Sequence, residues 1–70
     1  MELVKSLTIP DVKLPYCVVV MFDGDGSKFR KELVTRYNPG DISCQIERYT
    51  SLATINFRNE IDAADFLMRI

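Results

Sequence analysis

Residues 16 to 22 read YCVVVMF, a run that is apolar at odd and even positions alike. Successive side chains of a β-strand point to opposite faces of the sheet, so this run predicts a central strand buried on both faces. The next four residues, DGDG, end the run because glycine and aspartate disfavour regular strand structure. A central strand needs neighbours, and the rest of the chain must therefore build a sheet around it.

The spacing of apolar residues then changes and predicts an amphipathic helix over residues 27 to 37. The apolar side of this helix carries Phe29, Leu33, Val34 and Tyr37. Residues 38 to 41, NPGD, end the helix because proline cannot continue it and glycine favours a turn.

Two runs with alternating polarity follow, residues 42 to 49 and 52 to 57, and together they predict a β-hairpin. Their core-facing positions are Ile42, Cys44, Ile46, Ala53, Ile55 and Phe57. A second helix is predicted over residues 60 to 70, with Asn59 as its N-cap and Asp62 imitating a capping box. The apolar stripe of that helix carries Ala63, Phe66, Leu67 and Ile70.

The order β-α-β-β-α, with no internal repeat and no linker, predicts a single α+β domain. Residues 16 to 70 form this domain. Residues 1 to 15 precede it as an N-terminal arm or edge strand, which Pro10 and Pro15 would end. The arm could supply an extra strand to the sheet of its own chain or to that of a second copy.

Composition excludes several classes of function. The 70 residues include no histidine and two cysteines, so we expect no zinc site and interpret Cys17 and Cys44 as buried thiols. No activated nucleophile or base is apparent, and we expect neither an enzyme nor a bound cofactor. The start lacks the features of a signal peptide, and the longest apolar run is too short to cross a bilayer. We therefore expect an intracellular protein, cytoplasmic or nuclear, with no membrane or metal partner.

The segment Asp23-Gly24-Asp25-Gly26 has three interpretations. As a calcium loop it lacks a main ligand, because the best register places Met21 at the first ligand position. As a phosphate-binding turn before a helix it lacks a third glycine, and its aspartates would repel an anion. The simplest interpretation is a turn in which Asp25 or Ser27 caps the following helix.

The pattern resembles the RNA recognition motif family, which has a ferredoxin-like architecture. The resemblance implies an antiparallel sheet with two helices on one face. The resemblance rests on CVVVMF in the first strand and on TSLATINF, residues 50 to 57, in the third strand of the motif. The family adds a fourth strand after the second helix, and the N-terminal arm is the segment available to replace it. The family stacks RNA bases on aromatic side chains of the sheet, but Val19, Leu52 and Thr54 stand at those places here.

Apolar residues in those places indicate a contact surface for protein. If Val18 and Val20 point to the helices, other side chains point to the opposite face and form an exposed apolar patch. The expected protein interface consists of Cys17, Val19, Met21, Tyr49, Leu52 and Thr54. The opposite register, or an arm folded over this face, would leave no such patch.

The resulting hypothesis is a non-catalytic protein-interaction module that forms a homodimer or binds another protein. The resemblance implies that such a module belongs to an RNA-processing or regulatory protein. One alternative is weak binding of single-stranded RNA, although the net charge is −1. Its candidate contacts are Lys28, Arg30, Lys31, Arg36 and Arg48. The other alternative is a small-ligand sensor similar to ACT domains, which share this element order.

Overall fold

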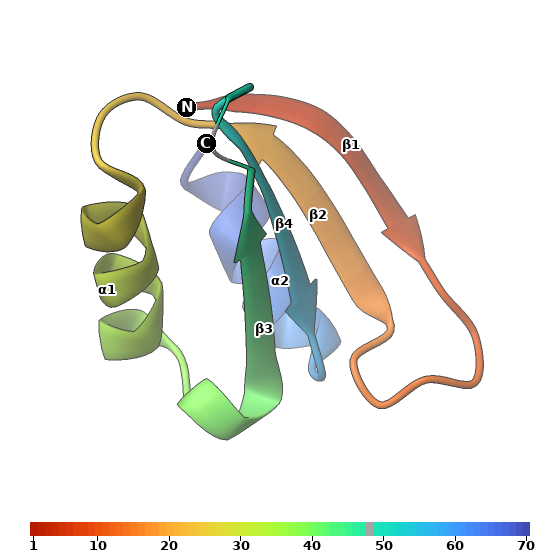
Figure 1. The fold of residues 1–70 in the computed structure, drawn as a ribbon. Helices are drawn as coiled ribbons and strands as arrows, with labels where there is room; N and C mark the ends of the chain where they lie inside the picture. The colour runs from red at the N-terminus through yellow and green to blue at the C-terminus, as the bar shows by residue number, and fades with distance from the viewer. Residues whose placement is uncertain (48) are drawn as a thin grey trace.

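The computed structural model describes residues 1–47 and 49–70. Arg48, one of the candidate RNA contacts, lies outside the described residues. The described chain forms four strands, two α-helices and one short 3-10 helix (Figure 1). In chain order these are β1 Glu2–Thr8, β2 Tyr16–Met21, α1 Gly26–Arg36, η1 Pro39–Asp41, β3 Ile42–Ile46, β4 Leu52–Phe57 and α2 Glu60–Met68.

The four strands form one antiparallel sheet in the order β1-β2-β4-β3. Strand β2 is central, as its apolar sequence predicted, with β1 on one side and β4 on the other. The N-terminal arm therefore supplies an extra strand to the sheet of its own chain: Thr8 pairs with Tyr16 and Glu2 with Met21. The predicted α+β class with an antiparallel sheet and two helices is confirmed.

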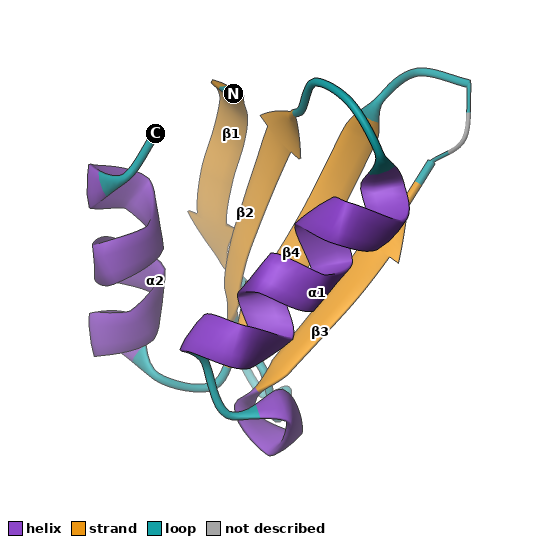
Figure 2. Cartoon of the chain, turned by 90° about the vertical axis from the view of Figure 1, so that its left-hand side faces the viewer, coloured by secondary structure: helices purple, strands orange, loops and turns teal. Residues whose placement is uncertain are grey.

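Both helices cover the same face of the sheet (Figure 2). Beneath them, Val18 and Val20 of β2 meet every second residue of β4, and Ala53, Ile55 and Phe57 are buried. The Phe57 ring centroid lies 5.3 Å from that of Tyr37, the C-cap residue of α1, and 5.7 Å from that of Phe66 in α2. One aromatic side chain of the sheet thus contacts both helices and joins them to the core.

Strand β1 is less well packed than the other strands, because each of its residues is exposed. Its register shifts between Leu3 and Lys5, where Val4 is the extra residue of a bulge. Leu3 pairs with Val20 and so lies on the helix-covered face, yet it is exposed. Neither helix makes extensive contact with β1, whereas α2 packs over β2 and β4.

Three details of the predicted elements were wrong. Strand β3 ends at Ile46 rather than continuing to residue 49, and α2 ends at Met68, leaving Ile70 partly exposed. Val34 was assigned to the core side of α1 but is exposed, since Leu33 and Tyr37 occupy that side. The predicted N-cap of α2 is confirmed at Asn59, whose side chain donates hydrogen bonds to Asp41 and Asp62 and accepts none from the helix backbone.

Candidate interaction surfaces

No described element covers the face of the sheet opposite the helices, called here the bare face (Figure 2). Residues paired across an antiparallel ladder lie on the same face, so the register assigns side chains to this face directly. Cys17 pairs with Leu7 on one side and with Asn56 on the other, and Met21 pairs with Leu52. The predicted orientation of β2 is correct: Val18 and Val20 face the helices. The alternating residues Cys17, Val19 and Met21 face away.

Two predicted interface residues are less accessible than expected. Cys17 is 6% exposed and Val19 is 8% exposed, although both lie on the bare face. They are short side chains at the centre of the sheet, each flanked by residues of β1 and β4. Exposure is greater at the two ends of the apolar band, where Leu7 is 41% exposed and Met21 is 44% exposed. We call the residues Leu7, Cys17, Val19, Met21 and Leu52 the bare-face band.

The remaining predicted interface residues lie at the border of this band. Leu52 and Thr54 are half-buried in β4, with Thr54 beside Val19. Tyr49 is 95% exposed and lies in the turn between β3 and β4 rather than within a strand. The structure therefore brings Met21, Leu52 and Thr54 together and places Tyr49 at the end of the sheet.

The two edge strands differ in how their backbone is protected. On β3, Arg30 of α1 donates a hydrogen bond to the Cys44 backbone oxygen at 3.1 Å and so occupies part of that edge. Within the described residues, no side chain makes a corresponding bond to β1. An uncovered edge presents unpaired backbone groups to other strands, although Lys5 and the nearby bulge oppose such pairing.

The DGDG segment forms the turn into α1. The Asp25 side chain accepts a hydrogen bond from the Ser27 backbone N–H at 2.8 Å, which is an N-cap interaction. Gly24 has a φ of 89°, a conformation that glycine adopts far more readily than other residues. The Ser27 N–H, which a bound phosphate would need, already donates to Asp25. The geometry therefore favours a turn over a phosphate site.

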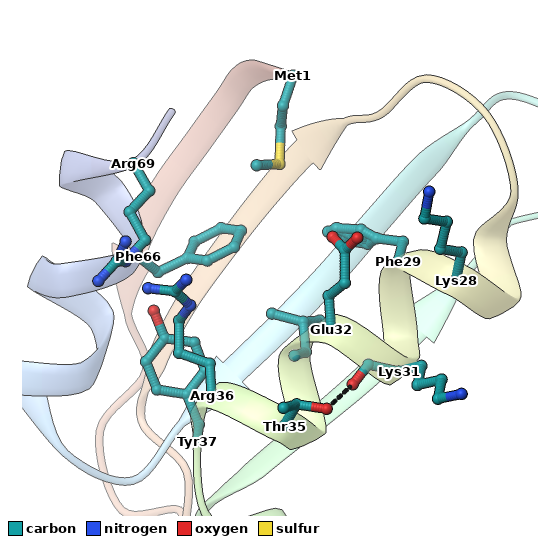
Figure 3. Close-up of a pocket in the computed structure, with 11 residues that line it drawn as sticks. Met1, Lys28, Phe29, Lys31, Glu32, Thr35, Arg36, Tyr37, Phe66 and Arg69 are labelled. Carbon is teal, nitrogen blue, oxygen red and sulfur yellow. Dashed lines mark hydrogen bonds between the residues drawn. The ribbon is translucent and has the colours of Figure 1, made fainter.

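A groove of about 770 Å³ lies between α1 and α2 (Figure 3). Leu33 and Phe66 are buried in its floor, and Phe29 is half-buried. The lining includes four of the nine lysine and arginine side chains but one of the ten carboxylates, Glu32. Basic residues thus outnumber carboxylates in the lining of this groove, although the net charge of the chain is −1.

The basic residues around this groove point in different directions (Figure 3). Arg36 of α1 and Arg69, just after α2, extend toward the same end of the groove, near Tyr37. Lys28 and Lys31 extend away from α2, toward solvent. Arg30 bonds to Cys44 on the other side of α1. The candidate RNA contacts that the structure describes therefore form no continuous basic surface.

A small polar network lies at the end of the groove toward which Arg36 and Arg69 extend, called here the arginine end. The Tyr37 hydroxyl donates to Asp65 at 2.8 Å, and Arg69 donates to the same carboxylate at 3.1 Å. These two hydrogen bonds lower the pKa of Asp65. Burial, together with the bond to Asp65, raises the pKa of Tyr37 to about 12. Tyr37 is thus a neutral hydrogen-bond donor at physiological pH.

Within residues 1–47 and 49–70, no three potential metal ligands lie together, and no helix is long and apolar enough to cross a membrane. Both thiols are unbonded, with Cys17 buried and Cys44 half-buried. Burial raises the pKa of Cys44, which disfavours the reactive thiolate form.

Sequence reasoning missed three contributors to these surfaces. Leu7 belongs to the bare-face band because β1 pairs with β2, a pairing that the arm sequence allowed but did not specify. Arg69 and Met1 line the groove because the chain termini lie near each other (Figure 1). The arm gave only a weak signal for a strand, because its apolar residues Leu3, Val4, Leu7 and Ile9 do not alternate cleanly with polar ones. Comparison with protein-family models, curated proteins and solved structures gave no match.

Proposed function

We propose that this chain is a non-catalytic protein-interaction module that associates with a second copy of itself through the bare face of its sheet. The observation that carries the proposal is the bare-face band. It runs from Leu7 through Cys17 and Val19 to Met21 and Leu52, and no described element covers it. Apolar surface exposed on a sheet face usually marks a contact site, and here the exposed part lies at the two ends of the band, at Leu7 and Met21.

The proposed architecture is a ferredoxin-like fold similar to the RNA recognition motif, with β1 standing where that family has its fourth strand. The order β1-β2-β4-β3 supports this interpretation, since β1 pairs antiparallel with the first strand of the β-α-β-β-α unit. The aromatic side chains that bind RNA in the family are replaced by Val19, Leu52 and Thr54. A protein surface therefore fits this face better than stacked bases do.

The band also has the arrangement expected of an interface. Its centre is apolar and its border carries polar residues, with Glu2 and Lys5 on β1 and Asn56 on β4. A small domain gains stability by association because its own core hides only about 60% of the surface that unfolding exposes. A stable interface needs about 800 Å² from each partner, so both the band and its border must take part.

Sedimentation velocity over a wide range of protein concentrations tests the proposal. We expect a dimer whose association is weakened at least tenfold by Met21→Asp and by Leu7→Asp, because each buries a charge in the interface. Val34→Asp is the matched control, since Val34 is 41% exposed on α1, away from the bare face. A wild-type chain that stays monomeric at every concentration, or folded variants that dimerise normally, would contradict the proposal.

The salt dependence of binding distinguishes the proposed apolar interface from RNA binding. An interface made mainly of apolar contacts should change little between low and physiological salt. RNA binding through lysine and arginine should weaken steeply over the same range because it releases counterions. Salt-sensitive binding to single-stranded RNA, without dimerisation, would favour the alternative.

A further inference from the structure

The groove between α1 and α2 combines an apolar floor with positive charge at one end. The floor is formed by Phe66, Leu33 and Phe29. The positive charge is that of Arg36 and Arg69 at the arginine end (Figure 3). This groove lies on the helix-covered side of the sheet, away from the bare face. A ligand bound in this groove would therefore not contact the proposed dimer interface.

The two arginines are in different states. Arg69 is held by the Asp65 carboxylate at 3.1 Å, an ion pair between residues four apart. Arg36 has no carboxylate within salt-bridge distance among the described residues. A guanidinium group binds carboxylates with paired hydrogen bonds, so Arg36 is the group that is available for an anion.

We propose that this groove binds a small organic anion, with its carboxylate at Arg36 and its apolar body on Phe66, Leu33 and Phe29. The groove volume of about 770 Å³ lies within the range of small-molecule sites. Arg36 follows Phe29 by two helical turns, so the floor extends over roughly 10 Å. That length suits one aromatic ring with a short chain that ends in a carboxylate.

Two carboxylates oppose a bound anion: Asp65 at the arginine end, which is already paired with Arg69, and Glu32 in the groove lining. The Glu32 carboxylate rises beside Phe29 rather than toward Arg36 (Figure 3). It precedes Arg36 by four residues, a spacing at which the two side chains can pair on the helix surface. Glu32 therefore competes with a bound anion, both by repulsion and by pairing with Arg36. Removing its charge should strengthen binding, whereas a merely structural role of the groove predicts no such gain.

Phenylbutyrate is the probe, and an NMR titration of backbone amides measures its binding. We expect saturable shifts centred on Leu33, Arg36 and Phe66. Phenylbutanol lacks the charge and acetate lacks the ring, so each should bind at least roughly fivefold more weakly. Shifts that do not localise to the groove, or equal binding of phenylbutanol, would overturn the proposal.

Three variants make the test specific. Arg36→Gln should weaken phenylbutyrate binding by roughly fivefold, and Glu32→Gln should strengthen it by about twofold. Lys31→Gln is the matched control, because it removes one positive charge from the same helix but its side chain extends away from Arg36 and Phe66 (Figure 3). Equal effects of Arg36→Gln and Lys31→Gln would show a general charge effect and would overturn the site. Circular dichroism confirms that each variant is folded.

Discussion

The Tyr37 hydroxyl donates a hydrogen bond of 2.8 Å to the Asp65 carboxylate and thereby connects α1 with α2. Tyr37 is the C-cap residue of α1, and Asp65 lies within α2. The ring of Tyr37 also packs edge-on against Phe57 of β4. One side chain thus contributes to the core and fixes the spacing of the two helices at the arginine end of the groove.

Replacing this hydroxyl should destabilise the fold. Tyr37→Phe keeps the ring but leaves Asp65 without one of its donors, and we expect the free energy of unfolding to fall by about 1 kcal/mol. Urea denaturation measures the change. Tyr49→Phe is the matched control, because Tyr49 is 95% exposed and its variant should stay within about 0.5 kcal/mol of the wild type. Equal stabilities of the two variants would contradict a structural role for the bond.

The lowered pKa of Asp65 predicts a stability that depends on pH in the acid range. The hydrogen bonds from Arg69 and Tyr37 favour the ionised carboxylate in the folded state, so the folded pKa lies below the ordinary value of 3.8. A depressed pKa contributes stability at higher pH, and that contribution is lost as the pH falls below the ordinary value. Asp65→Asn should therefore be less stable than the wild type at neutral pH, with a difference that shrinks below pH 3.8. Denaturation curves at several pH values measure this, and a constant difference would contradict it.

The turn before α1 provides a test of the DGDG segment. Asp25→Ala removes the N-cap bond to Ser27 and should lower the free energy of unfolding by about 1 kcal/mol. Asp23→Ala changes a neighbouring exposed aspartate that is not the N-cap, and it should stay within about 0.5 kcal/mol. Added calcium should not change the melting temperature of either variant. A calcium-dependent rise in the wild type that both substitutions remove would support an ion site instead.

The parts of the fold that follow from short-range periodicity were predictable. Ala53, Ile55 and Phe57 alternate with polar residues, and β4 has the predicted bounds with these three side chains buried. The core side of α1 followed from the spacing of Leu33 and Tyr37. Val34 was misassigned because it lies at the border of the core side of α1. Whether a residue at this border is buried depends on its contacts with neighbouring elements, which the spacing alone does not show.

The parts that depend on long-range pairing were not predictable in detail. Burial of Cys17 and Val19 on the bare face requires β1 beside β2, and the arm sequence left that pairing open. The approach of Arg36 and Arg69 requires α1 and α2 to lie at a particular separation on the sheet. No spacing along the chain specifies this separation, because it follows from the packing of Phe57 between the helices.

The exposure of β1 predicts unequal stability within the sheet. Each residue of β1 is exposed and the strand has one partner, whereas β2 is buried from Cys17 to Val20 and has two partners. Segments with few buried contacts open more readily than the rest of a domain. We therefore expect the slowest amides of β1 to exchange hydrogen at least roughly tenfold faster than those of β2, measured by NMR at concentrations where the protein is monomeric.

The variant Leu3→Ala tests whether β1 opens independently of the rest of the sheet. Leu3 is the apolar residue of β1 that lies opposite Val20 on the helix-covered face, yet 44% of it is exposed. Its truncation should accelerate exchange in β1 and leave exchange in β2 almost unchanged, because β1 can open without disturbing the core. Val20→Ala, made in the buried strand, should accelerate both strands, since a cavity beneath the helices lowers the stability of the whole domain. Equal acceleration of β1 and β2 by Leu3→Ala would show that β1 unfolds only with the rest of the sheet.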